Sequence, residues 1–180
     1  SWACTTVAIS MSPGCSGSNR IWFSPRTTSA GPAPSQAASP AAPVRVQLYF
    51  VGDTGTRTVL YREPYDLPAD PSVSDPARLA LAYLLAQGVA PVDPDYANLW
   101  GNGTTLNRIT YAGPNAAIDL TLRPLNVGSE AEARAIDQLV WTLTENHPGI
   151  TSVTLTSGGQ PLETLAGHID ATQAFQRGPD

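Results

Sequence analysis

The sequence contains no lysine, so all ten of its positive charges are arginines. This absence excludes enzymes that form a Schiff base on lysine, loops that hold phosphate with a lysine, and hydrolases that use a Ser-Lys pair. The net charge is −5 and the pI is about 4.8, without any run of basic residues. Because the electrostatic attraction that drives nucleic-acid binding is missing, we expect no nucleic-acid partner.

Cysteine and long apolar runs are also scarce. The two cysteines, Cys4 and Cys15, lie within the first fifteen residues, and neither has a histidine or a second cysteine at zinc-site spacing. They therefore predict no metal in the folded part. No apolar run approaches the roughly 20 residues that span a bilayer, so we expect no membrane-spanning segment in this sequence.

The amino-terminal quarter of the sequence is dominated by small residues and proline. Residues 24–43 are almost entirely Ser, Thr, Ala, Gly and Pro, a composition with too little apolar surface to offset the entropy of ordering. Prolines keep such a segment extended. We predict a disordered region and linker over residues 1–43, a folded domain over residues 44–170, and a tail over residues 171–180.

Cys15 is the candidate for lipid attachment. Gly14 precedes it and a polar, proline-rich tether follows, as in exported lipoproteins, although Ser12 and Pro13 depart from the usual residues of a lipobox. The alternative is a disulfide between Cys4 and Cys15 in an exported protein. The sequence leaves both open. A lipid on Cys15 would be the expected means of membrane attachment.

A strand pair is predicted at the start of the folded part. Apolar residues alternate along the first strand, and they resume at residues 59–61 after a short polar stretch. The alternating residues are Val44, Val46, Leu48 and Phe50. Both segments therefore fit an antiparallel hairpin with one apolar face.

The tripeptide Asp53-Thr54-Gly55 between these strands matches the motif that carries the catalytic carboxylate of aspartic proteases. In those enzymes two aspartates share one proton, and a chain of this length would need an identical partner to supply the second. Gly52, however, stands where the protease motif has an apolar residue. Residues 52–55 are all typical of a hairpin loop, so we interpret them as a turn and keep the homodimeric protease as an alternative.

Two helices are predicted. Asp75 can cap the first, with Pro76 at the first helical position. The second begins where Ser129 and Glu132 have the spacing of a capping box, and its apolar stripe stops at residues 147–149. That stripe consists of Ile136, Leu139, Val140 and Leu143.

The remaining elements complete a sheet. A second hairpin is predicted over residues 108–122 around a Gly113-Pro114-Asn115 turn, and a last strand precedes a Gly158-Gly159 turn. Because the strands and helices each show one apolar face, we predict an α+β fold. In this fold one mixed sheet carries both helices on one face, as a two-layer sandwich.

Few residues have the spacing of a catalytic or metal site. His147 and His168 are isolated in the sequence, and we interpret the first as a helix cap and the second as part of a solvated tail. Asp93 and Asp95 offer too few oxygens for a calcium loop, so we interpret them as an ordinary loop. We predict no catalytic, cofactor-binding or metal-binding residues and no cofactor.

Trp141 is the candidate partner contact. On the second helix it points well over 90° away from the apolar stripe, beside Arg134 and Asp137. An outward tryptophan among charges is typical of a binding anchor. The alternative is structural: the ring would fill the groove between the helices, against Tyr83 or Leu79.

In this order the elements resemble the GerMN domain of bacterial sporulation and germination proteins and of actinobacterial lipoproteins. Three segments carry the resemblance: VQLYFVGDTGTRTVLYREP, RITYAGPNAAIDLTL and AIDQLVWTLTENHPGITSVTLTSGGQPL. The third is the most specific, since it joins a helix, a Pro-Gly break, an apolar strand and a glycine turn. The resemblance covers residues 44–170, with Gly113-Pro114-Asn115 in place of the usual small turn.

The resemblance implies a non-enzymatic domain that acts outside the cytoplasmic membrane. Its expected partners are other envelope proteins, in the assembly of sporulation, germination or signalling complexes. It implies no catalytic residue and no cofactor. Two alternatives remain from the residues themselves: the aspartic protease that would use Asp53, and an extracellular domain that binds a sugar or a peptide.

Overall fold

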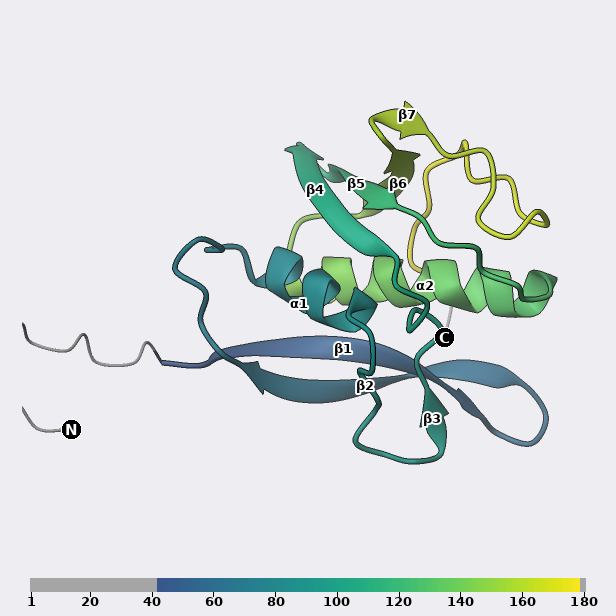
Figure 1. Ribbon diagram of the computed structural model, residues 1–180, viewed down its shortest axis with the longest axis horizontal. Helices are drawn as coiled ribbons and strands as arrows, with labels where there is room; N and C mark the ends of the chain where they lie inside the picture. Colours follow the sequence, from purple (N-terminus) through teal and green to yellow (C-terminus); the bar gives the residue numbers. More distant parts are fainter. Residues whose placement is uncertain (1–41, 179–180) are drawn as a thin grey trace, which may run out of the picture. The chain divides into compact units, whose positions relative to one another are not determined.

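The computed structural model describes residues 42–178, and its first element is a long twisted hairpin (Figure 1). Strand β1 (Val44–Asp53) pairs antiparallel with β2 (Thr58–Leu67) along its whole length. On its other edge β1 pairs only with the short β3 (Tyr96–Ala97). The first sheet therefore has the order β2-β1-β3.

A second sheet is built from the carboxyl-terminal half. Strands β4 (Thr105–Ala112) and β5 (Asn115–Thr121) form the predicted hairpin, joined by Gly113 and Pro114. Strand β6 (Ser152–Ser157) runs parallel to β5, and the short β7 (Gln160–Pro161) follows it antiparallel. The sheet is thus mixed, with the order β4-β5-β6-β7.

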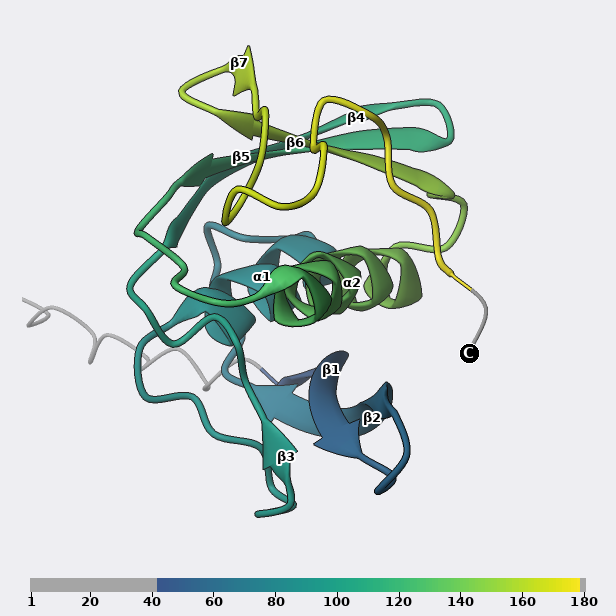
Figure 2. The same ribbon diagram turned by 90° about the vertical axis from the view of Figure 1, so that its right-hand side faces the viewer.

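The two helices lie between the two sheets, as the end view shows (Figure 2). Helix α1 (Pro76–Leu85) begins as predicted, because the carboxylate of Asp75 accepts a hydrogen bond of 3.0 Å from the N–H of Ala77. Helix α2 (Ser129–Asn146) buries its predicted apolar stripe. The α+β class is confirmed, but the strands form two sheets where the sequence pattern led us to expect one.

Helix α2 covers the part of the β1 edge that β3 leaves unpaired, which explains why the first sheet does not continue beyond β1 there. Side chains of α2 bind its main chain: the Asn146 amide accepts from the N–H of Gln47 at 2.9 Å and donates to its C=O at 2.7 Å. Thr142 accepts from the N–H of Tyr49 at 3.2 Å, and Gln138 donates to its C=O at 2.9 Å. Because these three residues lie one helical turn apart, they take the place of a neighbouring strand.

The beginning of α2 corrects one prediction. Gly128 is the N-cap and makes no side-chain bond, so the capping box of Ser129 and Glu132 is wrong. The side chain of Glu132 is fully buried and binds a loop that follows β7. Its carboxylate accepts four hydrogen bonds, from the Thr164 hydroxyl and the N–H groups of Leu165, Ala166 and His168.

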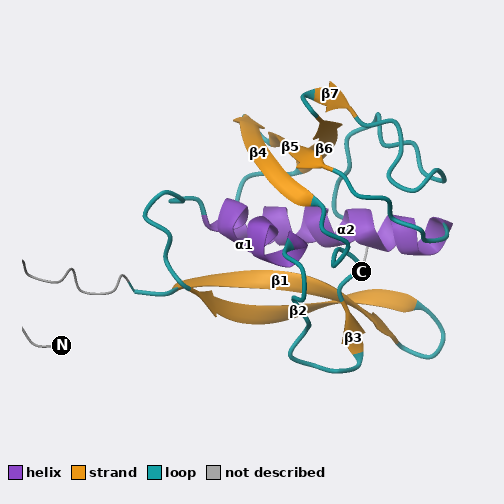
Figure 3. Cartoon of the chain, viewed as in Figure 1, coloured by secondary structure: helices purple, strands orange, loops and turns teal. Residues whose placement is uncertain are grey.

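Some loops, drawn in teal in Figure 3, contribute side chains to the core. Trp100, in the loop between β3 and β4, is fully buried, and its indole N–H donates to the C=O of Ala135 in α2 at 2.9 Å. In the segment that the sequence suggested to be a tail, Ala171 is buried and Phe175 forms a β-bridge with Val153. Neither helix of the described part is long and apolar enough to cross a bilayer.

Candidate functional site

A groove of about 700 Å³ lies where α2 passes the β1–β2 hairpin. We call it the arginine groove. Six of the residues that line it are Tyr49, Arg57, Leu60, Arg62, Arg134 and Trp141. They come from both strands of the hairpin, from its turn and from α2, so the groove exists only because the helix lies along β1.

Trp141 is half-buried and lines this groove. Its ring centroid is 5.2 Å from that of Tyr49, and the rings are tilted by 54°. The guanidinium carbon of Arg177 lies 4.8 Å from the centroid of the tryptophan ring, a cation–π contact. Tyr83, which the sequence suggested as an alternative neighbour, instead contacts Tyr65 at 5.5 Å. Trp141 therefore faces the hairpin and the carboxyl-terminal segment.

Glu145 holds the polar side chains around Trp141 in place. It accepts from the Tyr49 hydroxyl at 3.2 Å and pairs with Arg62 at 3.1 Å and Arg177 at 2.8 Å. Burial would raise the pKa of Glu145, but the bonds from Arg177, Tyr49 and Arg62 outweigh it and lower the pKa below its ordinary value. This carboxylate therefore stays charged at neutral pH and orders two arginines at the groove.

Positive charge exceeds negative charge in the arginine groove. Arg134 pairs with Asp137 at 3.0 Å, and its buried Nε has no acceptor in the described part of the chain. Burial raises the pKa of Asp137, although Arg134 opposes this. The exposed side chain of Arg57 makes no hydrogen bond or ion pair within residues 42–178. The groove thus has guanidinium groups able to bind carboxylates.

Asp53 is the last residue of β1, directly before the hairpin turn, and is exposed. Its carboxylate accepts from the N–H of Gly55 at 2.7 Å, and Gly55 has a φ of +82°. Gly52 is required for a different reason: a Cβ there would lie 2.7 Å from the ring of Tyr61 and 2.8 Å from that of Tyr96. The turn is confirmed for Thr54 and Gly55, whereas Gly52 and Asp53, also predicted in the turn, are the last two residues of β1.

Replacing Asp53 by alanine should therefore cost only about 0.5 kcal/mol of unfolding free energy, as at most exposed positions. Urea denaturation measures this, with Asp53→Asn as the control because its amide oxygen can still accept the bond from Gly55. Peptide hydrolysis that is blocked by pepstatin-type inhibitors and abolished in Asp53→Ala would contradict the interpretation.

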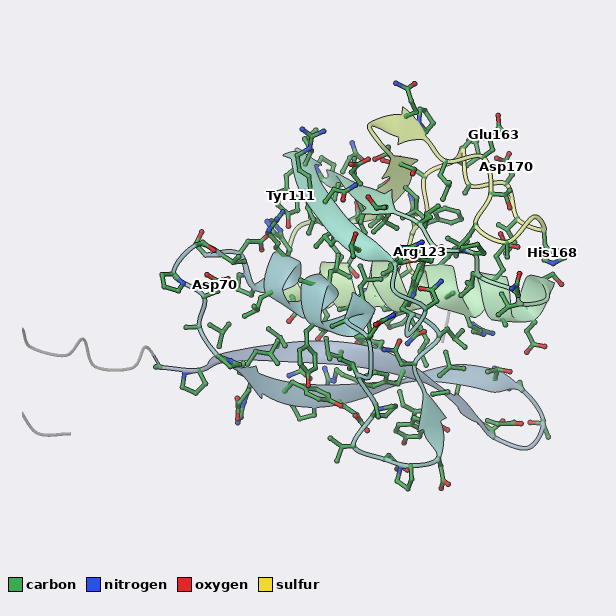
Figure 4. All side chains as sticks on the ribbon, in the orientation of Figure 1. Asp70, Tyr111, Arg123, Glu163, His168 and Asp170 are labelled. Atoms are coloured by element: carbon green, nitrogen blue, oxygen red, sulfur yellow. The ribbon has the colours of Figure 1, made fainter. Side chains whose placement is uncertain are left out.

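The histidines do not share a site. His147 is the C-cap of α2, as predicted, and stacks on Tyr111 at 4.3 Å, whose hydroxyl binds Asp75. Burial and this bond to Asp75 raise the pKa of Tyr111. His168 is exposed in the carboxyl-terminal segment, at the opposite end of the view from Tyr111 (Figure 4).

The acidic residues also lack the arrangement of a metal site. Asp93 accepts from the N–H of Asp95 at 3.0 Å, which makes this stretch an ordinary loop, as predicted. Across residues 42–178 no group of three or more His, Cys, Asp or Glu side chains is placed to hold an ion. Cys15 and Cys4, the candidates for lipid attachment or a disulfide, lie outside the described residues.

Two buried carboxylates were not predicted from the sequence. Glu63 accepts from the N–H groups of Val92 and Asp93 and fixes the loop after α1. Asp119 accepts from the N–H of Gly159 at 2.8 Å and from the Thr156 hydroxyl at 2.9 Å, and these bonds lower its pKa. For Asp119 the signal in the sequence was an acidic residue between two apolar residues of a predicted strand.

Comparison with known proteins places these features in a family. A family model described as Germane, sporulation and spore germination, matches residues 47–163. The first GerMN domain of the sporulation protein GerM from Bacillus subtilis is similar in structure, with a TM-score of 0.58 and 24% identity over 74% of this chain and 98% of that chain. No curated protein sequence matches the chain.

Two further solved structures are similar. The tandem GerMN domains of GerM from Bacillus subtilis match with a TM-score of 0.58 and 16% identity, covering 79% of this chain and 50% of that chain. A crystal structure of a putative lipoprotein from Clostridium perfringens has a TM-score of 0.49 and 18% identity over 78% and 93% of the two chains. The similarity to GerM shows a shared fold.

Proposed function

The chain belongs to the Germane family of sporulation and spore germination proteins, and from this we propose that it is a non-catalytic GerMN domain that binds other envelope proteins. Such binding would serve the assembly of sporulation, germination or signalling complexes. We place the protein outside the cytoplasmic membrane, secreted or held there by a lipid on Cys15. That location rests on the sequence around Cys15 and on the family.

The observation that supports binding is the position of Trp141. A large aromatic ring lies half-buried in an arginine-rich groove, and tryptophan, tyrosine and arginine are the residues that most often dominate binding energy at protein interfaces. Glu145 already orders Arg62 and Arg177 around it, so less side-chain entropy is lost when a partner binds. The groove is thus a preformed contact surface.

The size of the same groove favours a second candidate, an extracellular domain that binds a peptide or a sugar. Its volume of about 700 Å³ lies within the usual range of ligand sites. In that case a short ligand, and not a folded envelope protein, would occupy the space beside Trp141.

Trp141→Ala should reduce capture of envelope partners by at least about tenfold, because it removes the tryptophan ring that lines the groove. Treating intact cells of the native host with a membrane-impermeant crosslinker that reacts with carboxylates, since the chain has no lysine, tests the binding and the location together. Since the ring is only half-buried, the variant should lose about 1–2 kcal/mol of stability, less than a fully buried aromatic.

Two matched variants make this result specific. Leu106→Ala also shortens a half-buried apolar side chain, but on β4, outside the arginine groove. Trp141→Phe keeps an aromatic ring in the groove and should retain most of the capture. If Trp141→Ala lowered crosslinking no more than Leu106→Ala, the groove would not be the contact surface.

A further inference from the structure

Strand β2 is at the edge of its sheet, and its outer side has no neighbouring strand in the described part of the chain. In an antiparallel pair, alternate residues point their main-chain groups toward the partner strand and away from it. Gln47 and Tyr49 of β1 bind α2 through their main chains, so these groups point away from β2. Their register partners, Pro64 and Arg62, must therefore point outward, and so must Leu60.

Only part of this outer edge is protected. Pro64 has no N–H, and a proline at such a position prevents another strand from pairing there. From Thr58 to Arg62 no proline is present, and the outward main-chain groups of Leu60 and Arg62 have no partner within residues 42–178. We call the unprotected stretch from Thr58 to Arg62 the open edge; it ends before Pro64.

The open edge adjoins the arginine groove. Leu60 and Arg62 belong to both, and Arg57 stands at the turn that leads into β2. The groove is lined by three arginines, Arg57, Arg62 and Arg134, against one acidic side chain, Asp137. Glu130 also lies at the start of the open edge, where it accepts from the Thr58 hydroxyl at 2.7 Å. Although the chain as a whole is acidic, exposed charges beyond about 8 Å are largely screened at physiological salt, so the local excess decides.

We propose that β2 binds an extended acidic segment of a partner protein as an additional strand. The segment would pair with the main chain of Leu60 and Arg62, and its carboxylates would bind Arg57 and Arg62. Main-chain bonds supply the affinity of such strand addition, and alternate side chains supply the specificity. One row of side chains would face the arginine groove. This inference rests on the proposed function and specifies the kind of partner.

Hydrogen exchange can test in one experiment whether the open edge is unpaired and whether an added peptide pairs with it. In the free protein the amides of Leu60 and Arg62 should exchange at least about tenfold faster than those of Val59 and Tyr61, which bond to β1. A soluble heptapeptide of alternating glutamate and valine is the probe. At saturation it should slow exchange at Leu60 and Arg62 to the rate of their neighbours.

Two altered peptides separate the two parts of the recognition. The same peptide with N-methyl groups on the residues that face β2 keeps its charge but cannot complete the main-chain bonds, so it should bind at least about tenfold more weakly. The peptide with lysine in place of glutamate should not bind, because its positive charges would face the three arginines of the groove.

The protein offers a matched pair of charge reversals. Arg57→Glu alters a side chain with no ion pair in the described part and should weaken binding of the acidic peptide about tenfold. Arg108→Glu makes the same change at an exposed position on β4 and should leave binding unchanged.

Three results would overturn the proposal: slow exchange at Leu60 and Arg62 in the free protein, equal binding of the N-methylated peptide, or no binding of the acidic peptide. Sedimentation velocity shows whether a slow rate reflects pairing with a second copy of the chain. The crosslinking comparison of wild type and Trp141→Ala is independent of these results. If crosslinking succeeds and the peptide fails, the proposed function stands and only strand addition is lost.

Discussion

Trp100→Ala is expected to destabilise the protein by about 3–5 kcal/mol, the usual cost of emptying a large aromatic site in a core. The side chain of Trp100 is 0% exposed, and its indole N–H donates to the C=O of Ala135. It also joins the loop between β3 and β4 to α2, so its loss should loosen two parts of the structure. Urea denaturation monitored by circular dichroism measures the change.

Two comparisons identify the origin of this effect. Trp100→Phe keeps most of the buried area and loses the hydrogen bond, so it should cost about 1–2 kcal/mol. Val92→Ala shortens a side chain that is 77% exposed, and it should change stability by less than about 0.5 kcal/mol. Equal stability of Trp100→Ala and Val92→Ala would contradict the burial of this loop.

Glu132→Ala should cost about 3 kcal/mol, because it leaves several buried donors of the loop after β7 without an acceptor. The four hydrogen bonds to Glu132 are 2.7–3.0 Å long and come from residues 164–168. Glu132→Gln should cost less, since one amide oxygen remains to accept. Hydrogen exchange of the Ala166 and His168 amides should rise in the alanine variant before the rest of the domain is affected.

The same residue should give the wild-type protein part of its acid sensitivity. Burial would raise the pKa of Glu132, but the bonds from Ala166, Thr164, His168 and Leu165 outweigh it and hold the pKa below the ordinary value of 4.5. The unfolded chain therefore binds the proton more tightly. The stabilisation is fully present above pH 4.5 and is lost as the pH falls through the lower folded value.

Acid titration of the unfolding free energy checks this sign. Wild type should lose stability more steeply below about pH 4.5 than Glu132→Ala, in which the linkage is absent. Asp119 and Glu145 also have lowered pKa values, so the variant should retain a shallower decline of the same direction. Parallel curves for the two proteins would show that Glu132 is not the group responsible.

The sequence by itself determined the elements whose causes are local. Asp75 and Pro76 start α1 through a bond two residues away, and Asp53 closes the first hairpin through a bond to Gly55. Alternating and helical apolar patterns likewise predicted strands, helices and an α+β class. The family resemblance also came from these segments, since it depends on their order. For Trp141 the helical period showed that the ring points away from the apolar stripe.

Only the tertiary structure decided which distant groups satisfy each polar side chain. Gln138, Thr142 and Asn146 have the pattern of a solvated helix face, but they bind the edge of β1 and so divide the strands into two sheets. Glu132 has the spacing of a cap yet binds a loop more than thirty residues later. Trp100 stands in a polar stretch and is buried against α2. A hydrogen bond or a buried contact depends on distance in space, which sequence spacing does not record beyond a few residues.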